Sequence, residues 1–189
     1  MPRRSVRTLA QVITQDLPEA LRNFIREECR IPADVFRPLP GDRLPEPARQ
    51  LLFHSRDMTS TLGTFHESPL RVEILRRQRE NDFYLREVFL RTIAGDAIVE
   101  YGVIGIALDQ FTPSQQEAIE TGQAPLGGLL HRFAIPFTSA PIGFFSIRSG
   151  ALGATRFSGS KETTCYGRFN RLTKSTGEPL AWILEILPP

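Results

Sequence analysis

The sequence has little lysine, little cysteine and no long apolar run, and each shortage narrows what the protein can be. Of 23 basic residues only Lys161 and Lys174 are lysines, so arginine supplies almost all the positive charge. The formal net charge is +2 at pH 7, which leaves no electrostatic footprint for nucleic acid or an anionic membrane surface. We attribute the arginine excess to base composition, so each arginine must be judged by its own position.

Cysteine usage and hydropathy indicate the compartment. Cys29 and Cys165 lie far apart and form no CxxC motif, which argues against a secreted disulfide framework and favours a reduced, cytoplasmic setting. The longest apolar stretch, residues 103–108, is far shorter than the ~20 residues that span a bilayer, so we expect no membrane span.

Several signatures of cofactor chemistry are missing. The sequence has no GxxxxGK[ST] loop, no GxGxxG after a strand, no GxSxG and no HExxH. The histidines His54, His66 and His131 are isolated, without cysteine or carboxylate at metal-ligand spacing. We therefore expect no metal and no other cofactor.

Length and composition predict a single compact domain with two sequence regions. At 189 residues and 41% hydrophobic content, the chain can bury a substantial core. Residues 1–46 are expected to form a helix, with Asp16 as N-cap and an end near Cys29, and then a proline-rich connection without regular structure. Residues 47–189 are expected to form the main part of the domain.

Hydrophobic periodicity in this second region predicts mainly strands. Helices are expected over residues 47–54, 112–120 and 129–133, and strands over residues 70–75, 83–92, 97–108, 164–174 and 179–187. Short connections between consecutive strands indicate antiparallel pairing. The Gly- and Ser-rich residues 142–160 are expected to be irregular. The fold class is α+β, with helices packed on one antiparallel sheet.

Two charges stand where a buried strand does not tolerate them. Arg86 and Glu185 both lie within strands that are apolar on both faces, so each is expected to be buried. A buried arginine needs an anionic partner, and a buried carboxyl is held neutral unless a cation lies beside it. From these residues alone, an internal Arg86–Glu185 ion pair and a functional pair stay equally open. Glu87 is excluded as the partner of Arg86, because neighbours on a strand point to opposite faces.

Two short backbone elbows, residues 57–59 and 125–128, are further candidates. The second is tight and leads into a helix, so its N–H groups are suited to face an anionic ligand. Taken singly, such elbows are mostly just turns.

Together these segments resemble a known family. The motifs are Phe83-Tyr84-Leu85-Arg86-Glu87-Val88, Ala124-Pro125-Leu126-Gly127, Tyr166-Gly167-Arg168 with Arg171-Leu172, and Pro179-Leu180 followed by Leu184-Glu185 and Leu187-Pro188. In order and spacing they are similar to the chorismate–pyruvate lyase family over roughly residues 50–189. Asp57-Met58-Thr59 falls where that family has a Ser-Met-Thr segment.

The resemblance implies a monomeric α+β protein that encloses its ligand and converts chorismate to 4-hydroxybenzoate and pyruvate without a cofactor. It thereby implies a product of the kind used in quinone biosynthesis. In the family, the arginine matching Arg86 binds the ring carboxylate and the glutamate matching Glu185 contacts the ring hydroxyl. The remaining binding groups are backbone amides, which correspond to Met58, Thr59, Leu126 and Gly127.

The expected chemistry follows from the substrate. Loss of pyruvate makes the ring aromatic, and the enolpyruvyl methylene can itself take the ring hydrogen, so no strong base is needed. Arg86 is expected to fix the ring carboxylate. Glu185, expected to be protonated because it is buried, would bond the ring hydroxyl and assist departure of the ether oxygen.

The sequence departs from the family pattern in two places. Residues 134–163 are longer than the family's connection, and Tyr101 stands where some members carry an arginine. Candidates to contact the second carboxylate of chorismate are therefore Arg168, Arg171 and Tyr101. Arg168 and Arg171 lie on opposite faces of their strand, so at most one can point inward.

Two alternative functions also fit the sequence. One is a non-catalytic module of the same fold that binds a small acid. Against it, residues 1–45 are too short for a winged helix-turn-helix. The other is a lyase that makes a different aromatic acid from chorismate, a choice that pocket shape would decide.

Overall fold

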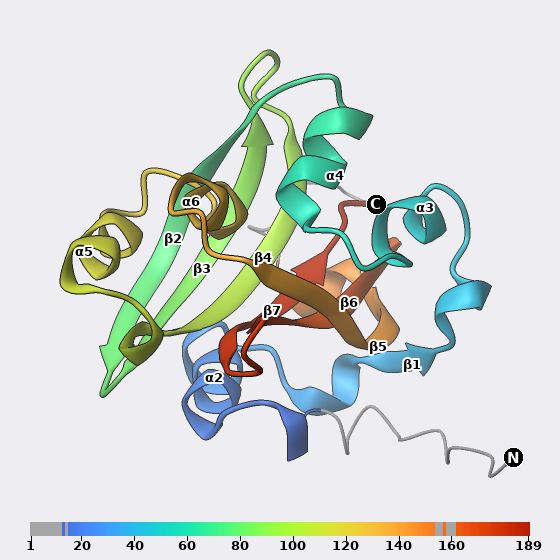
Figure 1. Cartoon of the computed structure of the whole chain (residues 1–189). Coiled ribbons are helices and arrows are strands. Elements are labelled where there is room, and N and C mark those ends of the chain that lie inside the picture. Colours follow the sequence, from blue (N-terminus) through green and yellow to red (C-terminus); the bar gives the residue numbers. More distant parts are fainter. Residues whose placement is uncertain (1–12, 14, 154–156, 158–161) are drawn as a thin grey trace, which may run out of the picture.

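A seven-stranded antiparallel sheet forms the centre of the fold (Figure 1). The structure is a computed structural model that describes residues 13, 15–153, 157 and 162–189. The strands are β1 (Arg37–Leu39), β2 (Leu70–Glu80), β3 (Phe83–Thr92), β4 (Ile98–Ala107), β5 (Phe137–Arg148), β6 (Thr164–Lys174) and β7 (Pro179–Ile186). Their order is β1-β5-β6-β7-β4-β3-β2, so β7 lies at the centre between two groups of three strands.

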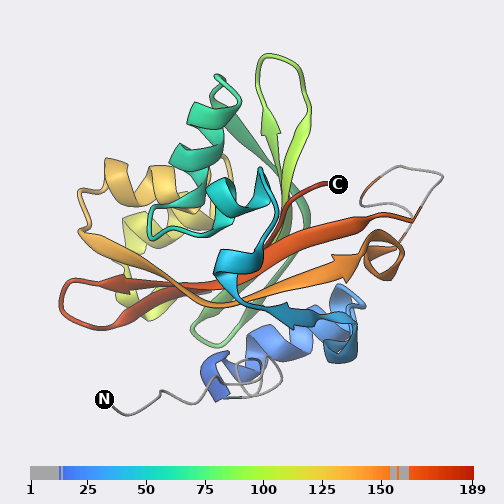
Figure 2. The ribbon, with the colours of Figure 1, turned by 90° about the vertical axis from the view of Figure 1, so that its right-hand side faces the viewer.

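Helices cover both faces of this sheet. They are α2 (Glu19–Asn23), continued by a π-helical turn (Phe24–Glu28), α3 (Ala48–Leu52), α4 (Met58–Phe65), α5 (Pro113–Thr121) and α6 (Leu126–Arg132). Figure 2 shows α2, in blue, on one side of the sheet and α3 to α6 on the other. The open sheet with packed helices confirms the predicted α+β class.

Alternation along the strands assigns each side chain to one of these faces. On β3, Leu85 and Phe89 join the core under α2, whereas Arg86 and Val88 point to the side of α4 and α6. The same alternation continues on β4, where Tyr101 faces α2. The α2 face is mainly an apolar core that also buries Glu87, whereas the other face buries several charges, Arg86 among them.

Most predicted elements are confirmed. The helix expected over residues 112–120 is α5, and Gly122 ends it in the left-handed conformation that favours glycine, with φ of 67°. The helix expected over residues 47–54 is α3, and the one expected over 129–133 is α6, which starts three residues earlier. The five predicted strands correspond to β2, β3, β4, β6 and β7, and β2 runs on to Glu80.

Three predictions about local structure were wrong. Residues 142–160 do not begin as an irregular segment, because β5 runs through to Arg148; part of that range lies outside the described residues. The proline-rich connection contains the short strand β1, which pairs with β5. Asp16 does not cap α2: it is itself helical, and α2 begins after Pro18.

Hydropathy gives one further finding. Among the residues described, no helix is long and apolar enough to cross a bilayer.

Candidate functional site

A cavity lies between the face of the sheet that carries Arg86 and the first turns of α4 and α6. Its floor is lined by Val72, Arg86, Val88, Leu90, Glu100, Gly102, Ile104, Asn170, Leu172, Ile183 and Glu185, and its roof by Asp57, Met58, Thr59, Pro125, Leu126 and Gly127. About 60 Å³ is open to the centres of water molecules, which is room for several waters. Most of the floor is aliphatic, with charged groups at its ends.

Both predicted elbows form this roof, and both are helix starts. Asp57 caps α4 by accepting a hydrogen bond from the Ser60 N–H at 2.8 Å, so residues 58–59 are the first turn of a helix and not an isolated elbow. A Cβ added to Gly127 would lie 3.1 Å from Asp57 Oδ1, which shows how closely α6 approaches α4. First-turn N–H groups have no acceptor within their own helix, which makes those of Met58, Thr59, Leu126 and Gly127 candidate donors to a ligand here.

Arg86 is buried in the cavity wall, with 2% of its surface exposed. Its Nε and Nη1 atoms have no hydrogen-bond partner among the described residues. Burial lowers the pKa of this guanidinium to about 10, so it stays positively charged at neutral pH. Arg86 is thus a buried cation with N–H groups that are left for a ligand.

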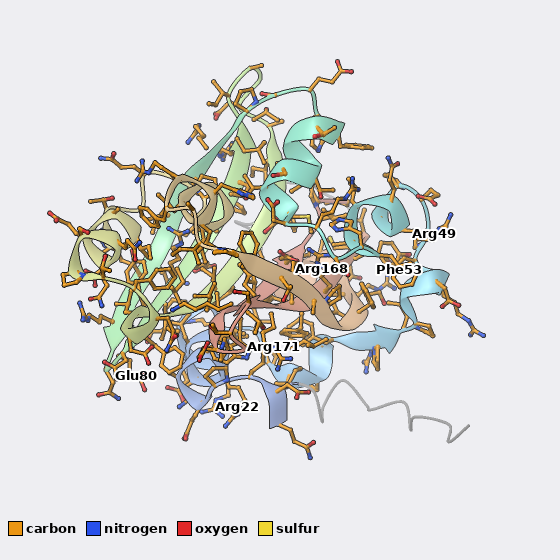
Figure 3. The ribbon with its side chains drawn as sticks, viewed as in Figure 1. Arg22, Arg49, Phe53, Glu80, Arg168 and Arg171 are labelled. Atoms are coloured by element: carbon orange, nitrogen blue, oxygen red, sulfur yellow. The ribbon has the colours of Figure 1, made fainter. Side chains whose placement is uncertain are left out.

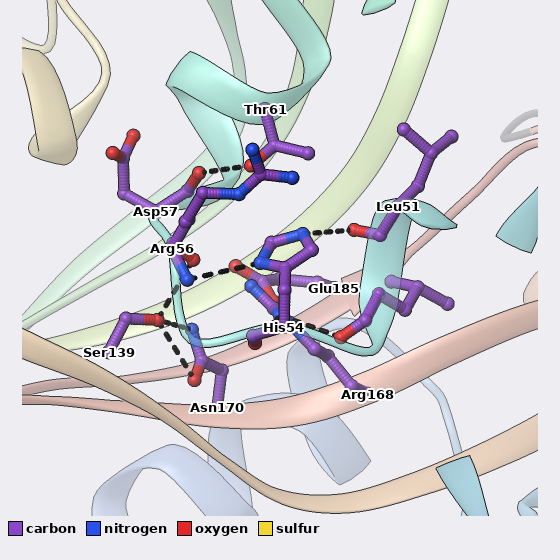
Figure 4. A network of polar contacts seen from close by, with 10 residues as sticks. Leu51, His54, Arg56, Asp57, Thr61, Ser139, Arg168, Asn170 and Glu185 are labelled. Carbon is purple, nitrogen blue, oxygen red and sulfur yellow. Dashed lines mark hydrogen bonds and ion pairs between the residues drawn. The ribbon is translucent and has the colours of Figure 1, made fainter. Parts of the chain in front are cut away.

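Glu185 is buried as predicted, but its partner is Arg168 and not Arg86. The two face each other directly across β6 and β7, and Nε of Arg168 donates to Oε2 of Glu185. Nη1 of Arg168 also donates to the carbonyl oxygens of Leu52 and His54, at 2.8 and 3.0 Å (Figure 4). The buried ion pair that the sequence left open between Arg86 and Glu185 is therefore formed by Arg168 and Glu185 instead.

Glu100 is a site residue that the sequence reading missed. It is 4% exposed, it lines the cavity, and its Oε2 atom has no hydrogen-bond partner among the described residues. Burial, together with the negative charge of Glu185, raises the pKa of Glu100 well above its ordinary value, against a smaller opposing effect of Arg168. The available signal was alternation, because Glu100, Gly102 and Ile104 share one face of an otherwise apolar strand.

The three candidates for a second carboxylate contact do not reach the cavity. Tyr101 faces α2, and its hydroxyl donates to Oε1 of Glu87 at 2.9 Å. Arg171 lies opposite Trp182 on that same face, and Figure 3 shows it toward α2, whereas Arg168 lies toward α3 and α4. Arg168 is on the correct face but is bound to Glu185 and is not among the residues that line the cavity. Tyr101 and Arg171 are therefore removed from the candidate site.

The segment between α3 and α4 is held by polar contacts that also fix the wall (Figure 4). Nδ1 of His54 accepts from the Arg56 N–H at 3.1 Å, so Nε2 carries the proton donated to the Leu51 carbonyl at 2.7 Å. Burial and the charge of Arg168 lower the pKa of His54, which favours this neutral form. The hydroxyl of Ser139 links the Arg56 carbonyl to the side chain of Asn170.

The described part of the chain contains no group of three or more His, Cys, Asp or Glu side chains placed to hold a metal ion. Within that described part, the cavity is thus lined by one guanidinium with unpartnered N–H groups, three carboxyl groups (Asp57, Glu100 and Glu185), backbone amides and a mainly apolar floor.

Comparisons with known proteins support the fold alone. No protein family and no curated protein matches the sequence. Among solved structures, the chain is similar to the gene product SA0254 from Staphylococcus aureus, with a TM-score of 0.53 and 9% sequence identity. The similarity covers 72% of this chain and 90% of that one, so the two proteins share the arrangement of the sheet and its helices.

Proposed function

We propose that the protein is a lyase that converts chorismate to 4-hydroxybenzoate and pyruvate in this cavity, without a cofactor. The observation that carries the proposal is Arg86, a buried guanidinium with unpartnered N–H groups in a mainly aliphatic cavity. Leaving a charged group buried without an anion costs several kcal/mol. An anionic ligand removes that cost, and a carboxylate matches the forked donors of a guanidinium.

The positions of Arg86 and Glu185 suit a ring that carries a carboxylate at one end and a hydroxyl group at the other. Arg86 pairs in register with Ile104, and Glu185 pairs with Gly102, so the two charges lie two strands and two residues apart on one face. Standard sheet spacings put their Cα atoms roughly 12 Å apart. The Glu185 side chain is bonded to Arg168 on β6, on the side away from Arg86, so the two side chains do not meet and the aliphatic floor lies between them.

In the proposed complex, Arg86 and the roof amides bind the ring carboxylate, and the Glu185 carboxylate accepts a hydrogen bond from the ring hydroxyl. The hydrogen on the hydroxyl-bearing carbon moves to the enolpyruvyl methylene while the bond between the ring and the ether oxygen breaks. That oxygen becomes the ketone of pyruvate, and the new ring double bond completes the aromatic system. No base is consumed, so the protein contributes mainly by holding the reacting conformation.

A small-acid-binding module is the second candidate, and one observation favours it. Chorismate carries two carboxylates, but the second arginine on this face, Arg168, is already bound to Glu185. A site with one free guanidinium fits a monocarboxylate such as 4-hydroxybenzoate as well as it fits chorismate.

Incubation of the purified protein with chorismate separates the two functions. The lyase produces 4-hydroxybenzoate and pyruvate in equal amounts, whereas the module binds 4-hydroxybenzoate and leaves chorismate intact. Arg86→Ala should abolish both binding and turnover. The matched control is Arg77→Ala, because Arg77 lies directly opposite Arg86 in β2 but is exposed and does not line the cavity. Binding unchanged in Arg86→Ala would refute both functions.

A further inference from the structure

We propose that Glu100 is the acid of this site, a neutral carboxyl group that donates a hydrogen bond to the ether oxygen of the substrate. This inference rests on the proposed lyase function and adds a catalytic residue to it. It also exchanges the roles expected from the sequence, because Glu185 then acts as a carboxylate.

The position of Glu100 brings it to the same end of the cavity as Glu185. Glu100 stands two residues before Gly102 on β4, and Gly102 lies directly opposite Glu185 on β7. A Cβ added to Gly102 would be 3.2 Å from Oε1 of Glu100, so this carboxyl group bends over the bare backbone of the cavity floor. Its other oxygen has no hydrogen-bond partner among the described residues.

Hydrogen bonding determines which of the two carboxyl groups is charged. Nε of Arg168 donates to Glu185, and Nη1 donates to the Leu52 and His54 carbonyls; no donor of Arg168 bonds Glu100. Two buried carboxyls beside one cation hold one negative charge more easily than two, as in other carboxyl pairs. The charge belongs on Glu185, and the proton on Glu100.

The surrounding charges agree with this assignment. The charges of Glu185 on β7 and Arg168 on β6 act on Glu100, while Arg86 on β3 and Asp57 at the start of α4 line the same cavity. The raised pKa of Glu100 has burial as its largest cause and the charge of Glu185 as its second.

A neutral acid is what the departing ether oxygen requires. As the bond between this oxygen and the ring breaks, electron density accumulates on the oxygen before it becomes the ketone of pyruvate. A hydrogen bond from Glu100 stabilises that density, and Glu100 keeps its own proton at the end of the step.

The protonation state can be tested without turnover. Infrared spectra at neutral pH should show the carbonyl stretch of one neutral carboxylic acid in the wild type, and Glu100→Gln should remove it. Glu87→Gln is the control, because Glu87 is equally buried but faces α2 and is paired with Arg76. A wild-type spectrum without the band, or a band that survives in Glu100→Gln, overturns the proposal.

Kinetics then test the catalytic role. Gln keeps an N–H donor where Glu100 has its O–H, so Glu100→Gln should retain kcat within about tenfold, whereas Glu100→Leu should lose 100-fold or more. The fall in kcat/KM at high pH should disappear in Glu100→Gln. Equal rates for the wild type and Glu100→Leu, with both folded by circular dichroism, overturn the role. Absence of turnover in the wild type refutes the lyase itself and the catalytic role with it, while the infrared result still decides the protonation state.

Discussion

Arg168 and Glu185 lie directly opposite each other on β6 and β7 and form a buried ion pair. Because Glu185 is bound there, Arg86 has no carboxylate partner on its own face of the sheet, and its Nε and Nη1 remain unpartnered among the described residues. The ion pair therefore separates the structural charges of the site from the charge that is free for a ligand.

Removal of one member of this pair should destabilise the fold strongly. Arg168→Met leaves Glu185 buried without its cation, and such a change costs about 3–5 kcal/mol. The double variant Arg168→Met with Glu185→Leu should recover most of that loss, because neither charge of the pair remains to be buried without its partner. Urea denaturation of the single and double variants measures both effects. A single variant as stable as the wild type would contradict the buried pair.

Arg86 should behave in the opposite way. Without ligand, Arg86→Met removes an unpaired buried cation, so we expect the free energy of unfolding to rise by about 1 kcal/mol or more. Binding of 4-hydroxybenzoate should fall by about 2–5 kcal/mol, which is roughly 30-fold or more. Thermal melts with and without the ligand give both quantities. If Arg86→Met melts lower than the wild type without ligand, Arg86 is a structural residue.

The raised pKa of Glu100 predicts a specific dependence of stability on pH. The folded state keeps a proton that the unfolded chain releases above its ordinary carboxyl pKa of about 4.3, so this group's stabilisation is lost as pH rises toward the raised value. Glu100→Gln lacks that proton and should gain stability relative to the wild type by up to about 1.4 kcal/mol per pH unit. Denaturation at pH 5, 6, 7 and 8 measures the difference, and a constant difference would rule out the raised pKa.

The lowered pKa of His54 predicts the opposite dependence of stability on pH. Because the pKa of His54 is lowered in the folded state, the unfolded chain takes up a proton at a higher pH than the folded protein does. The contribution of neutral His54 to the free energy of unfolding is therefore present above about pH 6.5 and is lost as pH falls through the lowered value. His54→Gln should remove this part of the acid sensitivity. Thermal melts of both proteins between pH 7.5 and 5 should converge as the pH falls. Parallel curves would show that His54 does not titrate there.

Gly102 should determine how much space the cavity leaves for a ligand above its floor. Gly102→Ala puts a methyl group 3.3 Å from Cγ2 of Val88 and beside Glu100, in the space assigned to the ring. We expect ligand binding to weaken by about 1–3 kcal/mol. The matched control is Gly105→Ala on the same strand, where the methyl group meets Leu21 at the same 3.3 Å but under α2. Calorimetry with 4-hydroxybenzoate should distinguish them, and equal affinities would exclude Gly102 from the site.

Strand alternation was sufficient to predict that Arg86 and Glu185 are buried, because it needs only local sequence. It was not sufficient to pair them, since pairing depends on strand order: β4 separates the strand of Arg86 from the strand of Glu185, and β6 brings Arg168 alongside. Glu100 went unnoticed although it is the only charge within β4.

The missed strand β5 has a similar physical reason. Pro141 and Gly143 interrupt its pattern and read as breakers, but the structure places them at an irregularity in the pairing with β6, where the ladder tolerates them. Likewise, residues 57–59 looked like an isolated turn because the helix that they begin buries only Met58, Thr61 and Leu62.

The central place of β7 has a consequence for hydrogen exchange. This strand joins β4, β3 and β2 to β6, β5 and β1, and the candidate site takes Arg86 from the first group and Asn170 from the second. A ligand bound across that junction resists any opening that separates the groups, by a free energy that grows with the ratio of ligand concentration to Kd. Amides on β4 and β7 should therefore be protected from deuterium by the ligand, more than those of the outer strands.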